Sequence, residues 1–315
     1  MMNQRRPKLV VIGSLNMDIV VETSAYPQVG ETITGQRVRF IPGGKGANQA
    51  VAGARLGADT VMIGAVGDDA FGEELLGSLQ KDGVDIAGVK RIEGTASGIA
   101  SIYVAEGDNS IVVVPGANGL VDPGDIDRSE DKLKEADLVL LQLEIPVETV
   151  LYAARKAKAL GKLVVLNPAP AQQLPEELFG LVDYFTPNRT ELSGYADMSA
   201  DGDSLEPAIR RMMELGAAHV VTTLGASGSA YLDEEGKLVR INGYKMPVVD
   251  TTGAGDCYNA ALAVALASGR DLRDAVDYAS MASALAVTKF GAQTGMPAEE
   301  EVARFAKDQG KEFAG

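Results

Sequence analysis

The sequence predicts an α/β fold in which helices cover both faces of a mostly parallel sheet, with a small β-sheet beside it. After residue 120, short apolar runs alternate with helix-length segments, as where Leu138–Gln142 precedes the helical Pro146–Leu160. Earlier, two β-rich runs within 98–115 are joined by the hairpin signal Glu106–Asn109. Parallel sheets of this kind bind ligands at the carboxyl ends of their strands, so site residues are expected just after the strands.

The chain has 315 residues, 46% of them hydrophobic and 23% charged, which is typical of a globular enzyme. We expect one domain over residues 1–315. The net charge of −15 disfavours binding to nucleic acid or to an anionic membrane. The longest apolar run, Ala260–Ala267, is too short to span a bilayer. A single cysteine, Cys257, fits a reducing cytoplasm.

The first part of the chain predicts a buried strand at Leu9–Gly13, because this apolar run has no polar alternation. A glycine loop then leads from Gly43 into a helix ending near Gly57, followed by a strand at Thr60–Val66 and a helix at Phe71–Lys81. The β-rich runs at about 16–23, 33–42 and 98–115 are predicted to form a small lid over the site.

Further elements are expected along the second half of the chain from the same periodicities. The predicted helices are 125–135, 205–215, 257–267, 271–289 and 299–307, and the predicted strands are 163–166, 184–186, 219–223, 229–232, 238–241 and 245–249.

The turn at 250–256 joins the last predicted strand to an alanine-rich helix. The small residues Gly253, Ala254 and Gly255 allow backbone N–H groups to converge at the positive end of that helix, which favours an anion. Asp256 beside them has the position of a general base for a hydroxyl group that attacks a phosphoryl group. The alternative for this motif alone is a tight turn with Asp256 as the helix N-cap.

Several other signatures are absent from the sequence. Lys45 is followed by Gly46 rather than by Ser or Thr, which excludes a Walker loop, and the first strand lacks the glycine pattern of a dinucleotide-binding fold. His219, at the start of a predicted strand, is the one histidine, which disfavours a Ser-His-Asp hydrolase.

Six motifs together resemble the ribokinase (PfkB) family of ATP-dependent carbohydrate kinases, and they occur in the family's order over nearly the whole chain. These motifs are Gly13–Asp18, Gly43–Ala50, Asn167–Ala171, Thr186–Glu191, Thr223–Gly225 and Asp250–Asp256.

The resemblance implies that the protein transfers phosphate from ATP to the 5-hydroxyl of D-ribose, with Mg²⁺ as cofactor and K⁺ as activator. It implies that Asp256 is the catalytic base and that Gly253, Ala254 and Gly255 form the anion hole. It also implies a homodimer joined through the lids. The expected sugar-binding residues are Asn16, Met17, Asp18, Gly44, Lys45, Gly46, Ala47, Asn48, Glu144 and Asp256.

The residues alone allow simpler interpretations at several of these positions. Asn16 and Asp18, two apart, face one way in an extended segment, but both residue types also occur in ordinary loops. For Lys45 the alternative is a solvated surface charge, and for Glu144 a surface acid flanking a helix.

The resemblance also implies a nucleotide site and two metal sites. The nucleotide residues are Asn188, Thr223, Leu224, Gly225, Ala226, Ser227, Gly228, Gly255 and Ser280. Asn188 and Glu191 would face Mg²⁺ through water, although this pair also forms a capping box signature. The expected K⁺ ligands are Asp250, Thr252, Ala286, Lys289, Gly291 and Gly295, and the family often has a hydroxyl residue at the last position.

Two rival functions remain open at this point. One is a related kinase acting on deoxyribose, another pentose or a nucleoside. The other is a non-catalytic module that senses sugar or nucleotide, which the intact Asp256 disfavours.

Overall fold

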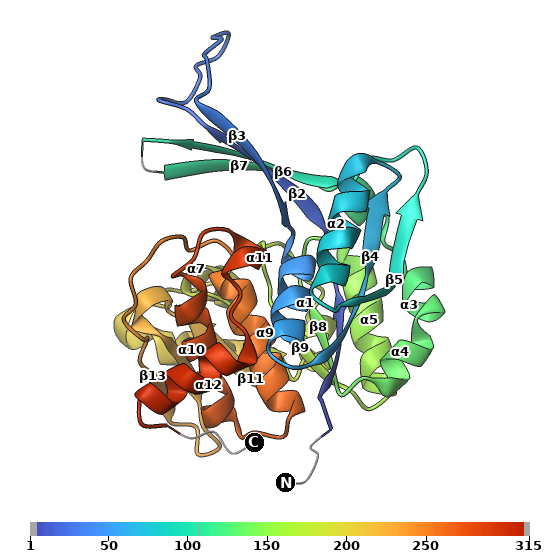
Figure 1. Cartoon of the computed structure of the whole chain (residues 1–315). Helices are drawn as coiled ribbons and strands as arrows, with labels where there is room; N and C mark the ends of the chain where they lie inside the picture. Colours follow the sequence, from blue (N-terminus) through green and yellow to red (C-terminus); the bar gives the residue numbers. More distant parts are fainter. Residues whose placement is uncertain (1–4, 107, 312–315) are drawn as a thin grey trace.

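A computed structural model describes residues 5–106 and 108–311 (Figure 1). Within them, one sheet has nine strands in the order β13-β12-β11-β10-β9-β8-β1-β4-β5. Its strands are β1 (Lys8–Ile12), β4 (Asp59–Gly67), β5 (Asp85–Ile92), β8 (Leu138–Leu141), β9 (Leu163–Leu166), β10 (Tyr184–Phe185), β11 (His219–Thr223), β12 (Ser229–Leu232) and β13 (Leu238–Ile241). The pairs from β5 to β11 are parallel, and β12 and β13 are antiparallel.

The helices cover both faces of this sheet, which confirms the expected fold class. They are α1 (Lys45–Arg55), α2 (Ala70–Lys81), α3 (Pro123–Arg128), α4 (Glu130–Glu135), α5 (Val147–Ala159), α6 (Glu176–Leu181), α7 (Arg189–Ala196), α8 (Leu205–Glu214), α9 (Ala254–Ala267), α10 (Leu272–Ala286), α11 (Ala292–Gly295) and α12 (Glu299–Asp308).

Strand β1 shows why the sheet is central. Leu9 and Val11 belong to one buried cluster, which α1, α9 and α10 complete. Val10 and Ile12 belong to a second cluster, which α5 and α8 complete on the opposite face. Because successive side chains of a strand point to opposite faces, an unbroken apolar run is what a strand covered on both faces requires.

A second sheet has the order β3-β2-β6-β7 and contains β2 (Asn16–Glu22), β3 (Arg37–Gly43), β6 (Gly98–Ala105) and β7 (Asp108–Val114). Asn16 pairs with both Gly43 and Gly98, so this sheet begins where the chain leaves β1. Figure 1 shows the strands running out beyond the helices. This matches the small sheet predicted from the sequence, although Gly107 of the predicted turn lies outside the described residues.

Several predicted elements were wrong or missing. The segment 245–249 is not a strand: Val248 and Val249 are exposed, and Pro247 has no N–H to donate to a neighbouring strand. Strand β5 and helices α6, α7 and α11 were not predicted as elements. The single helix expected at 125–135 is two helices that meet at Ser129, and α9 begins three residues earlier than expected, at Ala254.

No helix within the described ranges is both long and apolar enough to cross a membrane.

Candidate active site

The site forms where four segments meet at the carboxyl ends of the central strands. The chain after β1 provides Asn16 and Asp18, the start of α1 provides Lys45 and Asn48, the segment after β8 provides Glu144, and the first turn of α9 provides Asp256. Hydrogen bonds among these residues join the four segments. The structure therefore brings together most of the residues that the sequence predicted for the sugar and for the catalytic base.

The glycine loop before α1 packs closely against the segment that follows β1. Gly44 has φ of 89°, and a Cβ atom there would lie 2.6 Å from the backbone nitrogen of Asn16. A Cβ atom on Gly46 would lie 2.5 Å from the nitrogen of Ser14. Only glycine fits at these two positions, which explains the motif Gly43–Ala50 by packing as well as by backbone conformation.

Glu144 joins three parts of the site through one carboxylate oxygen. Its Oε2 accepts hydrogen bonds from Ser14 Oγ at 2.5 Å, from the Lys45 backbone N–H at 3.2 Å and from Asn16 Nδ2 at 3.3 Å. Glu144 therefore lies inside the site, and the interpretation of it as a surface acid is wrong.

Asn118 supports Asn16 from behind, and sequence reasoning missed it. Its Nδ2 donates to Asn16 Oδ1 at 2.8 Å and to the Leu15 carbonyl at 3.0 Å, while its Oδ1 accepts from the Leu15 N–H at 2.9 Å. Nothing in the local sequence around Asn118 indicates this role, because its partners lie about a hundred positions away.

Asp256 is buried in the first turn of α9, and the N-cap of that helix is Gly253, so the alternative of an Asp256 N-cap is wrong. Its Oδ2 accepts from Asn48 Nδ2 at 2.9 Å, and its Oδ1 accepts from Gln49 Nε2 at 3.0 Å. Burial raises the pKa of Asp256, whereas the charge of Lys45 and the two amide donors act to lower it. Gln49 was part of the motif but had no predicted role.

The other charged groups share the same electrostatic environment. Burial, together with the negative charges of Glu144 and Asp256, raises the pKa of Asp18 to about 7. Burial alone would lower the pKa of Lys45, but the nearby carboxylates raise it. Lys45 therefore carries a positive charge among four acids, Asp256, Glu144, Glu191 and Asp18, and is not a solvated surface lysine.

The start of α9 presents backbone N–H groups beside Asp256. Gly253 has φ of 76°, and a Cβ atom there would lie 2.9 Å from Ala292 Cβ, so glycine is required. The Ala254 N–H donates to the Thr251 carbonyl at 3.2 Å. The following first-turn N–H groups, those of Gly255 and Asp256, have no acceptor within the helix. Apart from its chain neighbours and the backbone of its own helix, a Cβ atom on Gly255 would meet no atom of the described residues within 4 Å. This opening suits an anion.

A cavity of about 410 Å³ adjoins this helix start. It is lined by six of the nucleotide residues predicted from the sequence (Thr223, Gly225, Ala226, Gly228, Gly255 and Ser280) and by residues of the extended segment 243–248. The segment that was wrongly predicted as a strand is thus one wall of the cavity.

Asn188 and Glu191 form a capping box at the start of α7. Asn188 Oδ1 accepts from the Glu191 N–H at 2.9 Å, and Glu191 Oε2 accepts from the Asn188 N–H at 2.8 Å. Asn188 also forms a β-bridge with Thr223, so this helix start adjoins the nucleotide cavity. Burial raises the pKa of Glu191, an effect that the Asn188 N–H and the charge of Lys45 partly oppose.

Asp250 holds the loop before α9 to the loop before α11. Its Oδ1 accepts from the Thr252 N–H at 2.9 Å and from Thr252 Oγ1 at 2.6 Å, and its Oδ2 accepts from the Gly291 N–H at 2.9 Å. Burial would raise the pKa of Asp250, but these hydrogen bonds lower it. A Cβ atom on Gly295 would lie 2.9 Å from the Ala286 carbonyl oxygen and 3.7 Å from that of Lys289, so two predicted ligands point at one space.

Some predicted residues have side chains outside the site. Met17, Ala47 and Leu224 are buried in the hydrophobic clusters, and Ser227 is exposed and does not line the cavity. Met17 alternates with Asn16 and Asp18 along β2, so its side chain points to the opposite face. His219 begins β11, far from the carboxyl ends, and its ring stacks on Tyr184.

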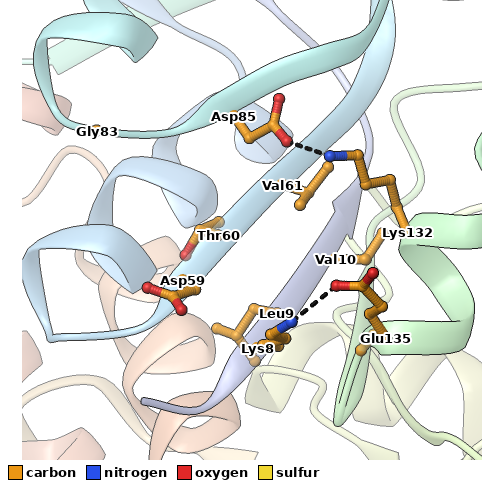
Figure 2. A pocket seen from close by; sticks show the side chains of 11 residues that line it. Lys8, Leu9, Val10, Asp59, Thr60, Val61, Gly83, Asp85, Lys132 and Glu135 are labelled. Atoms are coloured by element: carbon orange, nitrogen blue, oxygen red, sulfur yellow. Dashed lines mark hydrogen bonds and ion pairs between the residues drawn. The ribbon is translucent and has the colours of Figure 1, made fainter. Parts of the chain in front are cut away.

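A second hollow, of about 240 Å³, lies at the opposite edge of the sheet, by the first residues of β1 and β4 (Figure 2). Its two lysines already pair with acids: Lys8 with Glu135 at 2.7 Å and Lys132 with Asp85 at 2.6 Å. These ion pairs neutralise the two lysines that would otherwise attract an anion. The hollow therefore lacks the anion-binding character of the site at the start of α9.

The fold and the site are those of a sugar kinase, and the chain belongs to the pfkB family of carbohydrate kinases, whose model matches residues 6–299. Among its relatives, the ribokinase of Bacillus subtilis is 43% identical over 93% of this chain and 97% of its own. A deoxyribokinase of Salmonella typhi is 36% identical over 93% of this chain and 96% of its own.

Solved structures agree with this assignment. The Arabidopsis thaliana ribokinase complexed with ribose and ATP superposes with a TM-score of 0.90 at 34% identity, covering 96% of this chain and 99% of that one. A structure from E. coli in complex with ATP and Mg²⁺ gives a TM-score of 0.80 at 25% identity, covering 96% of this chain and 99% of that one.

Proposed function

We propose that this protein is an ATP-dependent ribose kinase that converts D-ribose and ATP into D-ribose 5-phosphate and ADP. The observation that carries the proposal is the buried Asp256 carboxylate, held by Asn48 and Gln49 beside open N–H groups of α9. The close relatives named ribokinase support the choice of sugar.

In the proposed reaction, the sugar lies between the second sheet and the start of α1. Asp18 accepts hydrogen bonds from sugar hydroxyls, and Asn16, Lys45 and Glu144 contact other sugar oxygens. The 5-hydroxyl gives its proton to Asp256 as its oxygen bonds to the γ-phosphorus, and the bond from that phosphorus to the β-phosphate oxygen breaks to release ADP. The amides at the start of α9 stabilise the negative charge on the transferred group.

The rival substrates are deoxyribose, other pentoses and nucleosides. A steady-state assay of ADP release across a panel of these compounds tests the proposal. We expect the highest kcat/KM with D-ribose, and a nucleoside or deoxyribose that is turned over far faster would contradict the assignment. If no compound in the panel releases ADP, the protein is a non-catalytic sensor of sugar or nucleotide instead.

The ATP-bound Mg²⁺ is proposed to lie near the start of α7, where Glu191 and Asn188 hold its water ligands. The half-buried Glu191 carboxylate already caps the helix through one oxygen, Oε2. The same side chain thus serves the helix and the metal.

Glu191→Gln separates these two roles. Glutamine at this position still accepts a hydrogen bond from the Asn188 N–H, so the capping box is kept, but the negative charge is lost. We expect the Mg²⁺ concentration for half-maximal activity to rise about tenfold with an unchanged Tm, because one charge-assisted contact to the hydrated metal is lost. Titration of activity with Mg²⁺ at fixed ATP is the measurement. An unchanged Mg²⁺ requirement would remove Glu191 from the metal site.

A K⁺ site is proposed beside the anion hole. The donors fit such an ion, because they are oxygens only: the Asp250 carboxylate and the carbonyls of Thr252, Ala286, Lys289 and Gly291. Gly295 contributes no side-chain oxygen, but the space beside it faces two of these carbonyls. Bound K⁺ would supply positive charge near the anion hole. Comparing the ribose assay in K⁺ and in an organic-cation buffer tests this proposal.

The pKa of Asp18 predicts how ribose binding depends on pH. Burial raises this pKa most, Glu144 and Asp256 raise it further, and Lys45 lowers it, with a result of about 7. The carboxyl group is therefore protonated below that pH and ionised above it. The ionised form accepts hydrogen bonds from two hydroxyls. We therefore expect the KM for ribose to rise about tenfold per pH unit below about pH 7. In Asp18→Asn this limb should disappear; a limb that persists would show that another group titrates.

We also propose a homodimer joined through the second sheet, in the cytoplasm. Strand β7 is an edge strand whose Ile111, Val112, Val113 and Val114 are each 46–59% exposed, and an exposed apolar edge favours pairing with another strand. The free, buried Cys257 fits a reducing compartment. Light scattering in solution tests the dimer.

A further inference from the structure

Asp256 is held by two neighbouring amide side chains, Asn48 and Gln49, which differ in the hydrogen bonds of their oxygens. Asn48 donates to one carboxylate oxygen, and its own Oδ1 is buried without a hydrogen-bond partner among the described residues. Gln49 donates to the other carboxylate oxygen and is fully buried, and its Oε1 accepts from Gln142 Nε2 at 2.5 Å. Asn48 thus keeps an acceptor for a ligand, whereas Gln49 uses its acceptor within the protein.

The Gln142 side chain fills a space that exists because residue 13 is a glycine. It follows β8, is fully buried, and lies against Gly13 just after β1: a Cβ atom on Gly13 would lie 1.9 Å from Gln142 Oε1. Gln49 Nε2 also approaches Asn167 Oδ1 at 3.3 Å. The amide of Gln49 is therefore fixed by groups from the ends of β8 and β9, two strands at the centre of the sheet.

The Asp256 carboxylate, at the end of this chain of hydrogen bonds, determines which group is donor and which is acceptor at each step. An ionised carboxylate is an acceptor only, so the nitrogen of Gln49 must face Asp256 and its oxygen must face Gln142. Gln142 then has to donate its N–H₂ group. Each amide has one orientation that satisfies its neighbour, and an N–H donated to a carboxylate favours the ionised form.

We propose that Gln49, fixed by Gln142, is the positioning residue of the catalytic base: it orients the Asp256 carboxylate and keeps it ionised in a buried site, ready to accept the proton of the sugar hydroxyl. Asn48 cannot replace it, because no described residue hydrogen-bonds to the Asn48 oxygen, so its amide is not fixed as that of Gln49 is. This proposal rests on the proposed kinase activity.

The experiment is the pH dependence of kcat for Gln49→Met at saturating ribose and ATP, from about pH 5 to about pH 9. Methionine keeps the length of the side chain but donates no hydrogen bond. We expect the acid limb of kcat to move up by about 1 pH unit, since the base loses a donor that favours its charged form, while the KM for ribose changes less than about twofold. At saturating ribose, kcat reports the pKa values of the enzyme–substrate complex. The titration of Asp18 in the free enzyme therefore does not contribute to this profile.

The other groups that face Asp256 are unchanged in this variant: Lys45 on α1, Glu144 after β8, Asp18 on β2 and the adjacent thiol of Cys257 on α9. Gln49→Glu is a second variant of equal size, in case the methionine variant does not fold. It places two carboxyl groups together, so its acid limb should move up further. An acid limb identical to that of the parent in either folded variant would overturn the proposal.

Thr149→Val is the matched control. Thr149 is fully buried in α5, and its Oγ1 donates to the Val121 carbonyl at 2.8 Å, away from the site. Its loss should lower Tm and leave the pH profile in place. If the parent protein releases no ADP with any sugar, the kinase proposal fails. An active parent with an unshifted acid limb in Gln49→Met removes only the role of Gln49.

Discussion

Replacing Asp256 with Asn should lower kcat with ribose by about 10²- to 10⁴-fold, while ATP and ribose still bind. Asparagine keeps the size of the side chain, and its oxygen can still accept from Asn48 or Gln49, but it cannot take the proton of the 5-hydroxyl. The measurement is kcat by ADP release, together with the Kd values of ATP and ribose by calorimetry.

Asp125→Asn is the control for this variant, because Asp125 is also a buried carboxylate in the first turn of a helix. It pairs with Lys90 at 2.6 Å and with Arg128, outside the site. Its replacement should lower Tm and leave kcat near that of the parent. If Asp256→Asn turns over ribose at a near-normal rate, Asp256 is not the base and the proposed mechanism is wrong.

The features that the sequence predicted correctly depend on residues that are close together along the chain. The glycines of the motifs at 43–46 and 253–255, the capping box of Asn188 and Glu191, and the apolar β1 are all local patterns, and the structure contains each of them. Likewise, the spacing of Asn16 and Asp18 placed both on one face of an extended segment, which became β2.

What the sequence did not predict depends on distant contacts. Asn48 and Gln49 meet Asp256 across 208 and 207 positions of the chain, and Asn118 meets Asn16 across 102. Gln49 carried one weak signal, since it follows Asn48 at the start of a helix that leaves a glycine loop. The prediction of a strand at 245–249 was wrong because of a misleading local pattern. The apolar residues of this segment resemble those of a buried strand, but the segment forms a wall of the cavity instead.

Replacing Asp18 with Ala should raise the KM for ribose by at least roughly 100-fold and that for ATP much less. Two sugar hydroxyls lose a charged acceptor, and each such hydrogen bond contributes about 1.5–3 kcal/mol. Steady-state kinetics with each substrate varied in turn gives both values. Glu22→Ala is the control on the same strand, where Glu22 pairs with Arg39 at 2.7 Å, and its ribose KM should stay near that of the parent. An unchanged ribose KM in Asp18→Ala would remove Asp18 from the sugar site.

The stability of the same variant should change in the opposite direction. Folding raises the pKa of Asp18 from 3.8 to about 7, so between these values the folded protein binds more protons than the unfolded chain. The contribution of Asp18 to the free energy of unfolding therefore falls as pH rises through this window. Without ribose, Asp18→Ala should gain Tm relative to the parent at about pH 8 and gain less at about pH 5. A variant that loses sugar affinity while gaining stability has lost a binding group, because general damage to the fold would lower both.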